Sequence, residues 1–172
     1  MNIPSYIDVI TKYYPSLQVR ANGNAYEDLI VLAESAIAIP SKEELDTKVK
    51  EDIIAQQWES IKTERDRRSQ TGGYKVGNYW YHSDQPSRTQ QIALVVIGAG
   101  LPTGLMWKTM SGEFVNMTQT LAQQVFGTAV QSDQAIFAKA EYHRAQMTTS
   151  ANPESYDFMV GWPLTFEESL IT

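Results

Sequence analysis

Cysteine is absent from this sequence, and histidine occurs only twice in 172 residues. Without cysteine the chain cannot form disulfide bonds or zinc–thiolate sites, so packing and association must stabilise it. The two imidazoles, His82 and His143, together with scattered carboxylates give no ligand spacing that specifies a metal ion. We therefore predict no metal site, and we interpret both histidines as surface or interface residues.

Long apolar runs and an excess of positive charge are also missing. The longest apolar stretch covers only residues 92–97, and no basic segment followed by an apolar core opens the chain, so neither a membrane span nor a secretion signal is expected. The formal net charge of -6 argues against electrostatic binding of nucleic acid, which requires clustered Lys and Arg. The one basic run, Glu-Arg-Asp-Arg-Arg at residues 64–68, predicts a solvated helix face on which the charges pair with each other.

No arrangement of residues typical of catalysis or cofactor binding is present. Gly98-x-Gly100-x-x-x-Gly104 follows an apolar run, but a dinucleotide site needs a helix that opens on this loop, whereas Pro102 and a hairpin follow here. The Gly-x-Ser-x-Gly motif of hydrolases is absent, and the carboxylates at residues 43–52 lie along one helix, where they serve solvation. We predict no catalytic residue and no cofactor, and thus a protein that is not an enzyme.

The first 40 residues predict one helix and one hairpin, which we interpret as an N-terminal docking unit. Its helix is indicated by apolar residues that share one face, Ile3, Tyr6, Ile7 and Ile10. Pro15 ends that helix. The alternating residues from Leu17 to Ala21 and the apolar run at 29–32 predict two strands, joined by a turn at Asn22-Gly23-Asn24.

A long connecting helix is predicted for residues 41–70. Ser41 is its expected N-cap, and Glu44 completes a capping box. Apolar residues at spacings of three and four then form one stripe, made of Leu45, Val49, Ile53, Ile54, Trp58 and Ile61. Such a helix is roughly 40 Å long, which exceeds what a compact domain of this size needs. We expect part of the stripe to contact a second chain.

Residues 71–150 predict two short hairpins and two helices. Gly77-Asn78 and Ser111-Gly112 are the turns of the hairpins, and Asp84 caps the helix that ends before Gly98. Thr118 or Thr120 caps the last helix. Its buried positions are expected at Ala122, Phe126, Ala129, Asp133, Ile136, Ala140, His143 and Met147. Because alanine and aspartate make a poor coiled-coil seam, packing within the chain is favoured over a coiled coil.

Large aromatic side chains are concentrated in two places that are candidates for protein contacts. The hairpin at residues 74–81 carries Tyr79, Trp80 and Tyr81, which either cover the domain's own core or contact a partner or a sugar. The tail at residues 151–172 is too apolar to remain in water, so it either wraps its own domain or inserts into a partner. The candidate interface residues are Trp58, Tyr79, Trp80, Tyr81, Tyr156, Phe158, Trp162 and Phe166.

Several short motifs occur in order along the central region. They are Trp58-x-x-Ile61-Lys62-x-x-Arg65-Asp66-Arg67-Arg68, the aromatic hairpin, Ser87-Arg88, Gly100-Leu101-Pro102, Trp107-Lys108-Thr109, Phe114-Val115-Asn116-Met117-Thr118 and Phe137-Ala138-Lys139-Ala140. This order resembles a domain of unknown function found in tailed-phage tail-fibre and tail-assembly proteins. Upstream, residues 39–45 (Ile-Pro-Ser-Lys-Glu-Glu-Leu) are similar to the proline hinge that follows the opening domain in phage tail-fibre-associated proteins.

Taken together, the patterns predict an α+β fold with a small N-terminal helix and hairpin unit, a long connecting helix, a helical domain with two short hairpins, and an extended C-terminal tail. The expected boundaries are 1–40, 41–70, 71–150 and 151–172. The resemblance implies that residues 71–150 form a tail-fibre-associated domain.

The resemblance implies a role in the virion or in its assembly. We expect a non-enzymatic structural component of a phage tail, an adaptor that attaches or organises tail fibres at the baseplate. A tail-fibre assembly chaperone that is absent from the mature virion is the alternative, and an enzyme acting on host polysaccharide is a third class. The expected partners are other tail proteins and further copies of the chain, without nucleic acid or membrane. The expected location is the virion tail, after synthesis in the host bacterial cytoplasm.

Overall fold

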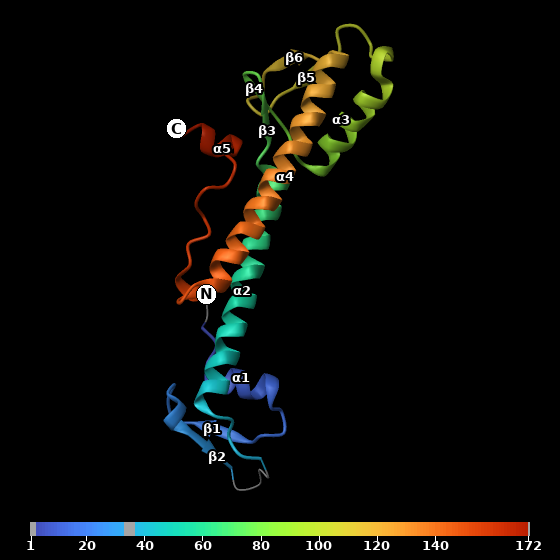
Figure 1. The fold of residues 1–172 in the computed structure, drawn as a ribbon. Helices are drawn as coiled ribbons and strands as arrows, with labels where there is room; N and C mark the ends of the chain where they lie inside the picture. The colour runs from blue at the N-terminus through green and yellow to red at the C-terminus, as the bar shows by residue number, and fades with distance from the viewer. Residues whose placement is uncertain (1–2, 33–36, 172) are drawn as a thin grey trace. The chain divides into compact units, whose positions relative to one another are not determined.

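Helices and short hairpins make up the chain, which is 58% helical and has an α+β fold, as predicted. The computed structural model describes residues 3–32 and 37–171. Among these, unit 1 contains residues 3–32, 37–60 and 145–156, and unit 2 contains residues 61–144 and 157–171. Two long helices, α2 (Lys42–Thr71) and α4 (Gln119–Thr149), contribute residues to both units. Figure 1 labels the elements, and each unit is described by itself.

Unit 1 begins with the predicted helix and hairpin. Helix α1 (Tyr6–Tyr13) starts at Ser5, whose hydroxyl accepts from the Asp8 amide at 3.3 Å while the Asp8 carboxylate accepts from the Ser5 amide at 2.8 Å. Strands β1 (Val19–Ala21) and β2 (Leu29–Val31) pair antiparallel, with the short helix η1 (Tyr26–Asp28) between them. The core residues of this unit are Val9, Ile10, Leu17, Leu29 and Leu45.

Helix α2 starts as the sequence predicted. The Glu44 amide donates to the Ser41 hydroxyl at 3.3 Å, and the Ser41 amide donates to the Glu44 carboxylate at 2.8 Å. The predicted apolar stripe is present, because Leu45, Ile53 and Ile61 are buried and Val49, Ile54 and Trp58 are half-buried. Four polar residues complete the buried face of the helix, Asp52, Gln57, Glu64 and Arg68.

Unit 2 contains the other two hairpins and the rest of the helices. Strands β3 (Tyr74–Val76) and β4 (Tyr79–Tyr81) pair antiparallel around Gly77, whose φ of 59° suits a two-residue turn. Helix α3 (Gln85–Ile97) has Asp84 as its N-cap and ends at Gly98, where the short helix η2 (Gly98–Gly100) follows. Strands β5 (Met106–Lys108) and β6 (Phe114–Asn116) form the last hairpin.

Helix α4 follows β6 and is capped by Thr118, whose hydroxyl accepts from the Leu121 amide at 3.1 Å. The buried positions of α4 are Ala122, Val125, Ala129, Ile136, Ala140, His143 and Met147. The expectation for Phe126 was wrong, because its side chain is exposed and the neighbouring Val125 faces the core instead. The buried stripe therefore packs within the chain, as favoured over a coiled coil.

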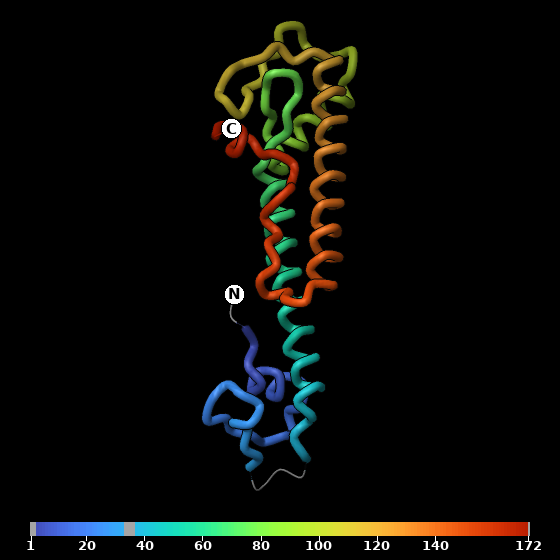
Figure 2. The backbone as a smooth tube through the Cα atoms, turned by 60° about the vertical axis from the view of Figure 1, so that its left-hand side comes forward, coloured from blue at the N-terminus to red at the C-terminus, as the bar shows by residue number. Residues whose placement is uncertain are grey.

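The C-terminal segment returns along unit 2 after the short helix η3 (Pro153–Ser155). Residues 157–165 are extended and lie beside residues 61–71 of α2 and beside α4 (Figure 2). Helix α5 (Phe166–Ser169) follows. The segment thus wraps its own domain, which is one of the two alternatives that the sequence left open. Within the described residues, no helix has both the length and the apolar character needed to cross a bilayer.

Candidate interaction site

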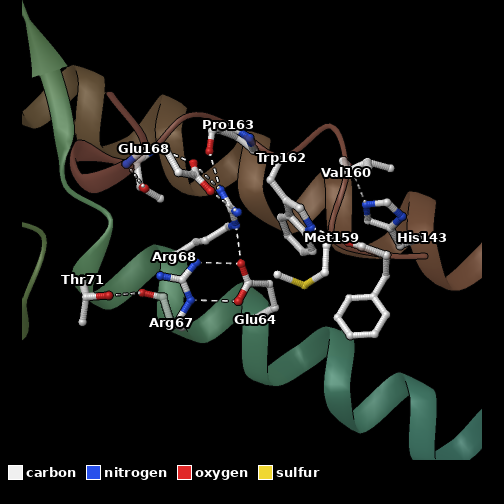
Figure 3. A network of polar contacts seen from close by, with 12 residues as sticks. Glu64, Arg67, Arg68, Thr71, His143, Met159, Val160, Trp162, Pro163 and Glu168 are labelled. Carbon is white, nitrogen blue, oxygen red and sulfur yellow. Dashed lines mark hydrogen bonds and ion pairs between the residues drawn. The ribbon is translucent and has the colours of Figure 1, made fainter. Parts of the chain in front are cut away.

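Arg68, in the last turn of α2, holds the C-terminal segment to the helix. Its side chain is buried, and its guanidinium donates to Glu64 Oε1 at 2.6 Å, to the Pro163 carbonyl at 2.9 Å and to Glu168 Oε1 at 2.6 Å (Figure 3). A planar guanidinium offers several donors in a fixed geometry, so one residue can bind several acceptors at once. Arg68 therefore connects α2 with two parts of the C-terminal segment.

Glu64 is the second buried charge of this network. It accepts from Arg67 Nη2 at 2.7 Å as well as from Arg68, and the hydrogen bonds from Arg67 are the main reason why the pKa of Glu64 is lowered. The run 64–68 was expected to be a solvated helix face. That expectation was wrong for Glu64 and Arg68, which the C-terminal segment covers, although the pairing between the charges of the run is present.

Glu168 combines a helix cap with the ion pair. Its carboxylate accepts from the Thr165 amide at 2.9 Å, and its own amide donates to the Thr165 hydroxyl at 3.3 Å, which forms the capping box of α5. The hydrogen bond from Arg68 is the largest cause that lowers the pKa of Glu168 to about 2. The carboxylate therefore stays charged well into the acidic range.

Trp162 lies between Arg68 and α4. Its side chain is buried, its indole donates to the Phe158 carbonyl at 2.6 Å, and its ring centroid lies 5.3 Å from that of His143. The Arg68 guanidinium carbon lies 5.5 Å from the Trp162 ring, within range of a cation–π contact. The indole thus connects the C-terminal segment with His143 of α4 and with Arg68 of α2 (Figure 3).

His143 is buried beneath the same segment. Its Nε2 lies 3.1 Å from the Val160 carbonyl, and burial is the main cause that lowers the pKa of His143. The expectation that both histidines are surface or interface residues was therefore wrong for His143, whereas His82 is half-buried.

The aromatic hairpin β3–β4 is covered on both faces. Tyr74 and Tyr81 pair across the strands and lie in the core of unit 2, where burial raises the pKa of Tyr74 to about 12. Trp80 points to the other face, and its ring centroid lies 6.1 Å from that of Phe166 in α5. The Phe166 amide also donates to the Gly72 carbonyl at 2.8 Å. The C-terminal segment therefore covers the face of the hairpin that the core does not.

The candidate interface residues are distributed between the interior and the surface. Trp80, Tyr81 and Trp162 are buried by the chain itself, so they are not surface contacts in this conformation. Five others are half-buried and remain candidates, Trp58, Tyr79, Tyr156, Phe158 and Phe166. The structure brings Trp80 and Phe166 together.

Unit 2 contains a second ion pair, which the sequence analysis did not predict. Arg88 on α3 pairs with Asp133 on α4 and donates to the Ser83 carbonyl at 2.6 Å and to the Ser69 carbonyl at 2.7 Å. An aspartate within the predicted buried stripe of α4 was the available signal, because a carboxylate at such a position needs a cation. For Glu168 the signal was the capping-box pattern Thr165-x-x-Glu168.

Within the part of the chain that the structure describes, no group of three or more His, Cys, Asp and Glu side chains could hold a metal ion. Residues 52–160, more than half of the chain, match the family described as Domain of unknown function (DUF4376). The motifs between residues 58 and 140 lie inside this range, so the expected domain of unknown function is confirmed there. No match was found among curated proteins or among solved structures.

Proposed function

The chain belongs to this family of unknown function, and we propose that it is a non-enzymatic structural component of a phage tail. In this role it is an adaptor that attaches or organises tail fibres at the baseplate. The order of the sequence motifs, which resembles tail-fibre and tail-assembly proteins, supports the association with phage tails.

The pairing of charged groups within the chain is the observation that carries the structural role. Arg68 and Arg88 each connect segments that are distant in the sequence, and their donors are taken up by carboxylates and carbonyl oxygens of the same chain. Catalytic groups instead face a cleft, where their bonding capacity is available to a substrate. These ionic groups therefore support a rigid scaffold.

Exposed apolar side chains support docking against other proteins. Val96 on α3 is 80% exposed, and Leu170 and Ile171, which follow α5, are 72% and 85% exposed. Apolar groups in water favour association when they are gathered on a binding surface. We propose that the partners are the tail fibre, the baseplate and further copies of this chain, and that the protein joins the virion tail after synthesis in the host cytoplasm.

Quantitative mass spectrometry of purified virions tests this function. An adaptor should be present in a fixed ratio to the major tail proteins, while abundant host cytoplasmic proteins serve as the control for contamination. If the protein is abundant in infected cells and missing from virions, the adaptor role is rejected and an assembly chaperone is favoured.

A separate assay addresses enzymatic activity. The purified protein should release no reducing sugar from envelope polysaccharide of the host. Release that disappears when a single carboxylate is substituted would contradict the non-enzymatic role.

A further inference from the structure

A hollow of about 510 Å³ lies in unit 2 beside the turn of β3–β4. Its wall is formed by three parts of the chain, namely residues 76–79 and 81, residues 114–116 of β6, and residues 121 and 124 in the first turns of α4. This volume lies within the range of small-molecule sites, about 300–1,000 Å³. Because three separate elements meet here, the wall is held by the fold of unit 2 and not by one flexible loop.

The wall of this hollow carries no carboxylate, ammonium, guanidinium or imidazole group. None of the described residues that line it is Asp, Glu, Lys, Arg or His, although 20% of the chain is charged. An anionic or cationic ligand would find no counter-charge here, so the chemistry favours a neutral ligand.

Amides and aromatic rings are the binding groups that the wall offers. Asn78, Asn116 and Gln124 are exposed, and each side-chain amide can both donate and accept hydrogen bonds. Tyr79 comes from one hairpin and Phe114 from the other, and Phe114 is 62% exposed. Tyr81 also lines the hollow. Its buried hydroxyl has no hydrogen-bond partner among the described residues.

Two hollows of unit 1 are different, because carboxylates in their walls already accept hydrogen bonds from the same chain. The one beside Tyr6 is lined by Asp8 and Asp46, whose carboxylates accept from Ser5 and from Tyr6. The next is lined by Asp52, which accepts from Lys12 at 2.6 Å. The hollow beside β3–β4 is therefore the stronger candidate for a ligand.

We propose that this hollow binds a neutral saccharide. Sugar hydroxyls donate and accept as the three amides do, and the C–H face of a sugar ring is apolar and can lie against the exposed ring of Phe114. An extended peptide would instead need a continuous row of backbone partners from one strand edge, whereas this wall mixes a turn, a short strand and a helix. The site is independent of whether the chain is a tail adaptor.

Nuclear magnetic resonance of the full chain labelled with ¹⁵N tests the proposal. The probes are neutral mono- to tetrasaccharides of glucose, galactose and N-acetylglucosamine, each titrated to millimolar concentration. At least one is expected to shift amide signals of residues 76–81, 114–116 and 121–124. The Phe114→Ala variant should weaken this binding by about tenfold, because a ring that stacks on the sugar is lost.

Matched variants separate binding from folding. Asn116→Ala should also weaken binding, whereas Ile92→Ala, which removes a half-exposed apolar group of α3 outside the hollow, should leave it unchanged. Each variant must keep the dispersed spectrum of the wild type. The proposal is overturned if no saccharide shifts these signals, if the shifts lie elsewhere, or if Phe114→Ala binds as tightly as the wild type. Shifts caused by an uncharged peptide and by none of the saccharides would assign the hollow to a protein partner instead.

Discussion

At the scale of single residues, Arg68 determines how the C-terminal segment is attached. Its side chain is buried together with that of Glu64, and it reaches Glu168, which is 100 positions later in the chain. A buried ion pair adds little stability by itself, but removing one partner leaves an uncompensated charge in the interior. The consequence can be measured because a neighbouring arginine offers a control.

The Arg68→Ala variant should lose about 3 kcal/mol of unfolding free energy, since Glu168 and the Pro163 carbonyl would lose their donor and the buried Glu64 would keep only the more exposed Arg67. The control is Arg67→Ala, which removes a cation from the same Glu64 but at a side chain that is 42% exposed. This control should lose less than about 1 kcal/mol. Urea unfolding followed by circular dichroism measures both, and equal losses would contradict the account.

The same network makes stability depend on pH. Glu168 has a pKa of about 2 in the folded chain against an ordinary value of 4.5, so its contribution is complete above pH 4.5 and is lost as the pH falls toward 2. Glu64, whose pKa is also lowered, adds to the same loss. Melting temperatures measured across this window should fall less steeply for Glu168→Gln than for the wild type. An unchanged slope in Glu168→Gln would count against the ion pair.

At the scale of helices and hairpins, local chemistry was sufficient to predict most boundaries. Ser41 with Glu44 fixes the start of α2, Asp84 and Gly98 delimit α3, and Gly77 supplies the positive φ of the first hairpin turn. Each signal acts within a few residues. For this reason it can be read before any tertiary contact is known.

Features that depend on distant partners could not be predicted in the same way. The buried face of α2 includes Glu64 and Arg68 only because the C-terminal segment lies over them. Val125, and not Phe126, lies in the core. The heptad pattern alone does not fix which of two adjacent apolar residues faces inward, so the sequence did not predict this. The sequence shows three aromatic residues on one hairpin, but the covering of Trp80 by Phe166 is a long-range contact that no local signal indicates.

Trp162 and Leu164 are apolar residues two positions apart in the C-terminal segment, and only Trp162 is buried. Trp162→Ala should destabilise the chain by about 3 kcal/mol, because the indole is buried against His143 and Arg68. Leu164→Ala is the matched control, since Leu164 is 50% exposed, and it should cost less than about 1 kcal/mol. Thermal unfolding of both variants measures the difference. A loss for Leu164→Ala that equals the loss for Trp162→Ala would show that the segment is not held by its indole.

At the scale of the whole molecule, both units use polar groups on α2 to hold another segment. In unit 1, Asp52 of α2 accepts from Lys12 and Tyr13 of α1, each at 2.6 Å. In unit 2, Arg68 of α2 binds the C-terminal segment. In a chain without cysteine, such contacts take the place of covalent crosslinks. This shared use of α2 supports the proposal that the protein is a scaffold.

We also expect several copies of this chain to associate. Exposed apolar groups such as Val96 and Leu170 favour contacts between chains. Sedimentation equilibrium of the purified protein should therefore give a multiple of the 19.4 kDa chain mass. A monomer mass at all concentrations would contradict the expected homo-oligomer.

Hydrogen–deuterium exchange across residues 157–171, in the wild type and in Arg68→Ala, tests most directly whether buried ionic contacts fasten the chain to itself. If these contacts fasten the segment, the Phe166 amide, which donates to the Gly72 carbonyl, is protected in the wild type. In Arg68→Ala this protection should fall more than that of the amides in β3 and β4. Equal protection of the segment in both proteins, or no protection in the wild type, would show that Arg68 does not fasten the segment.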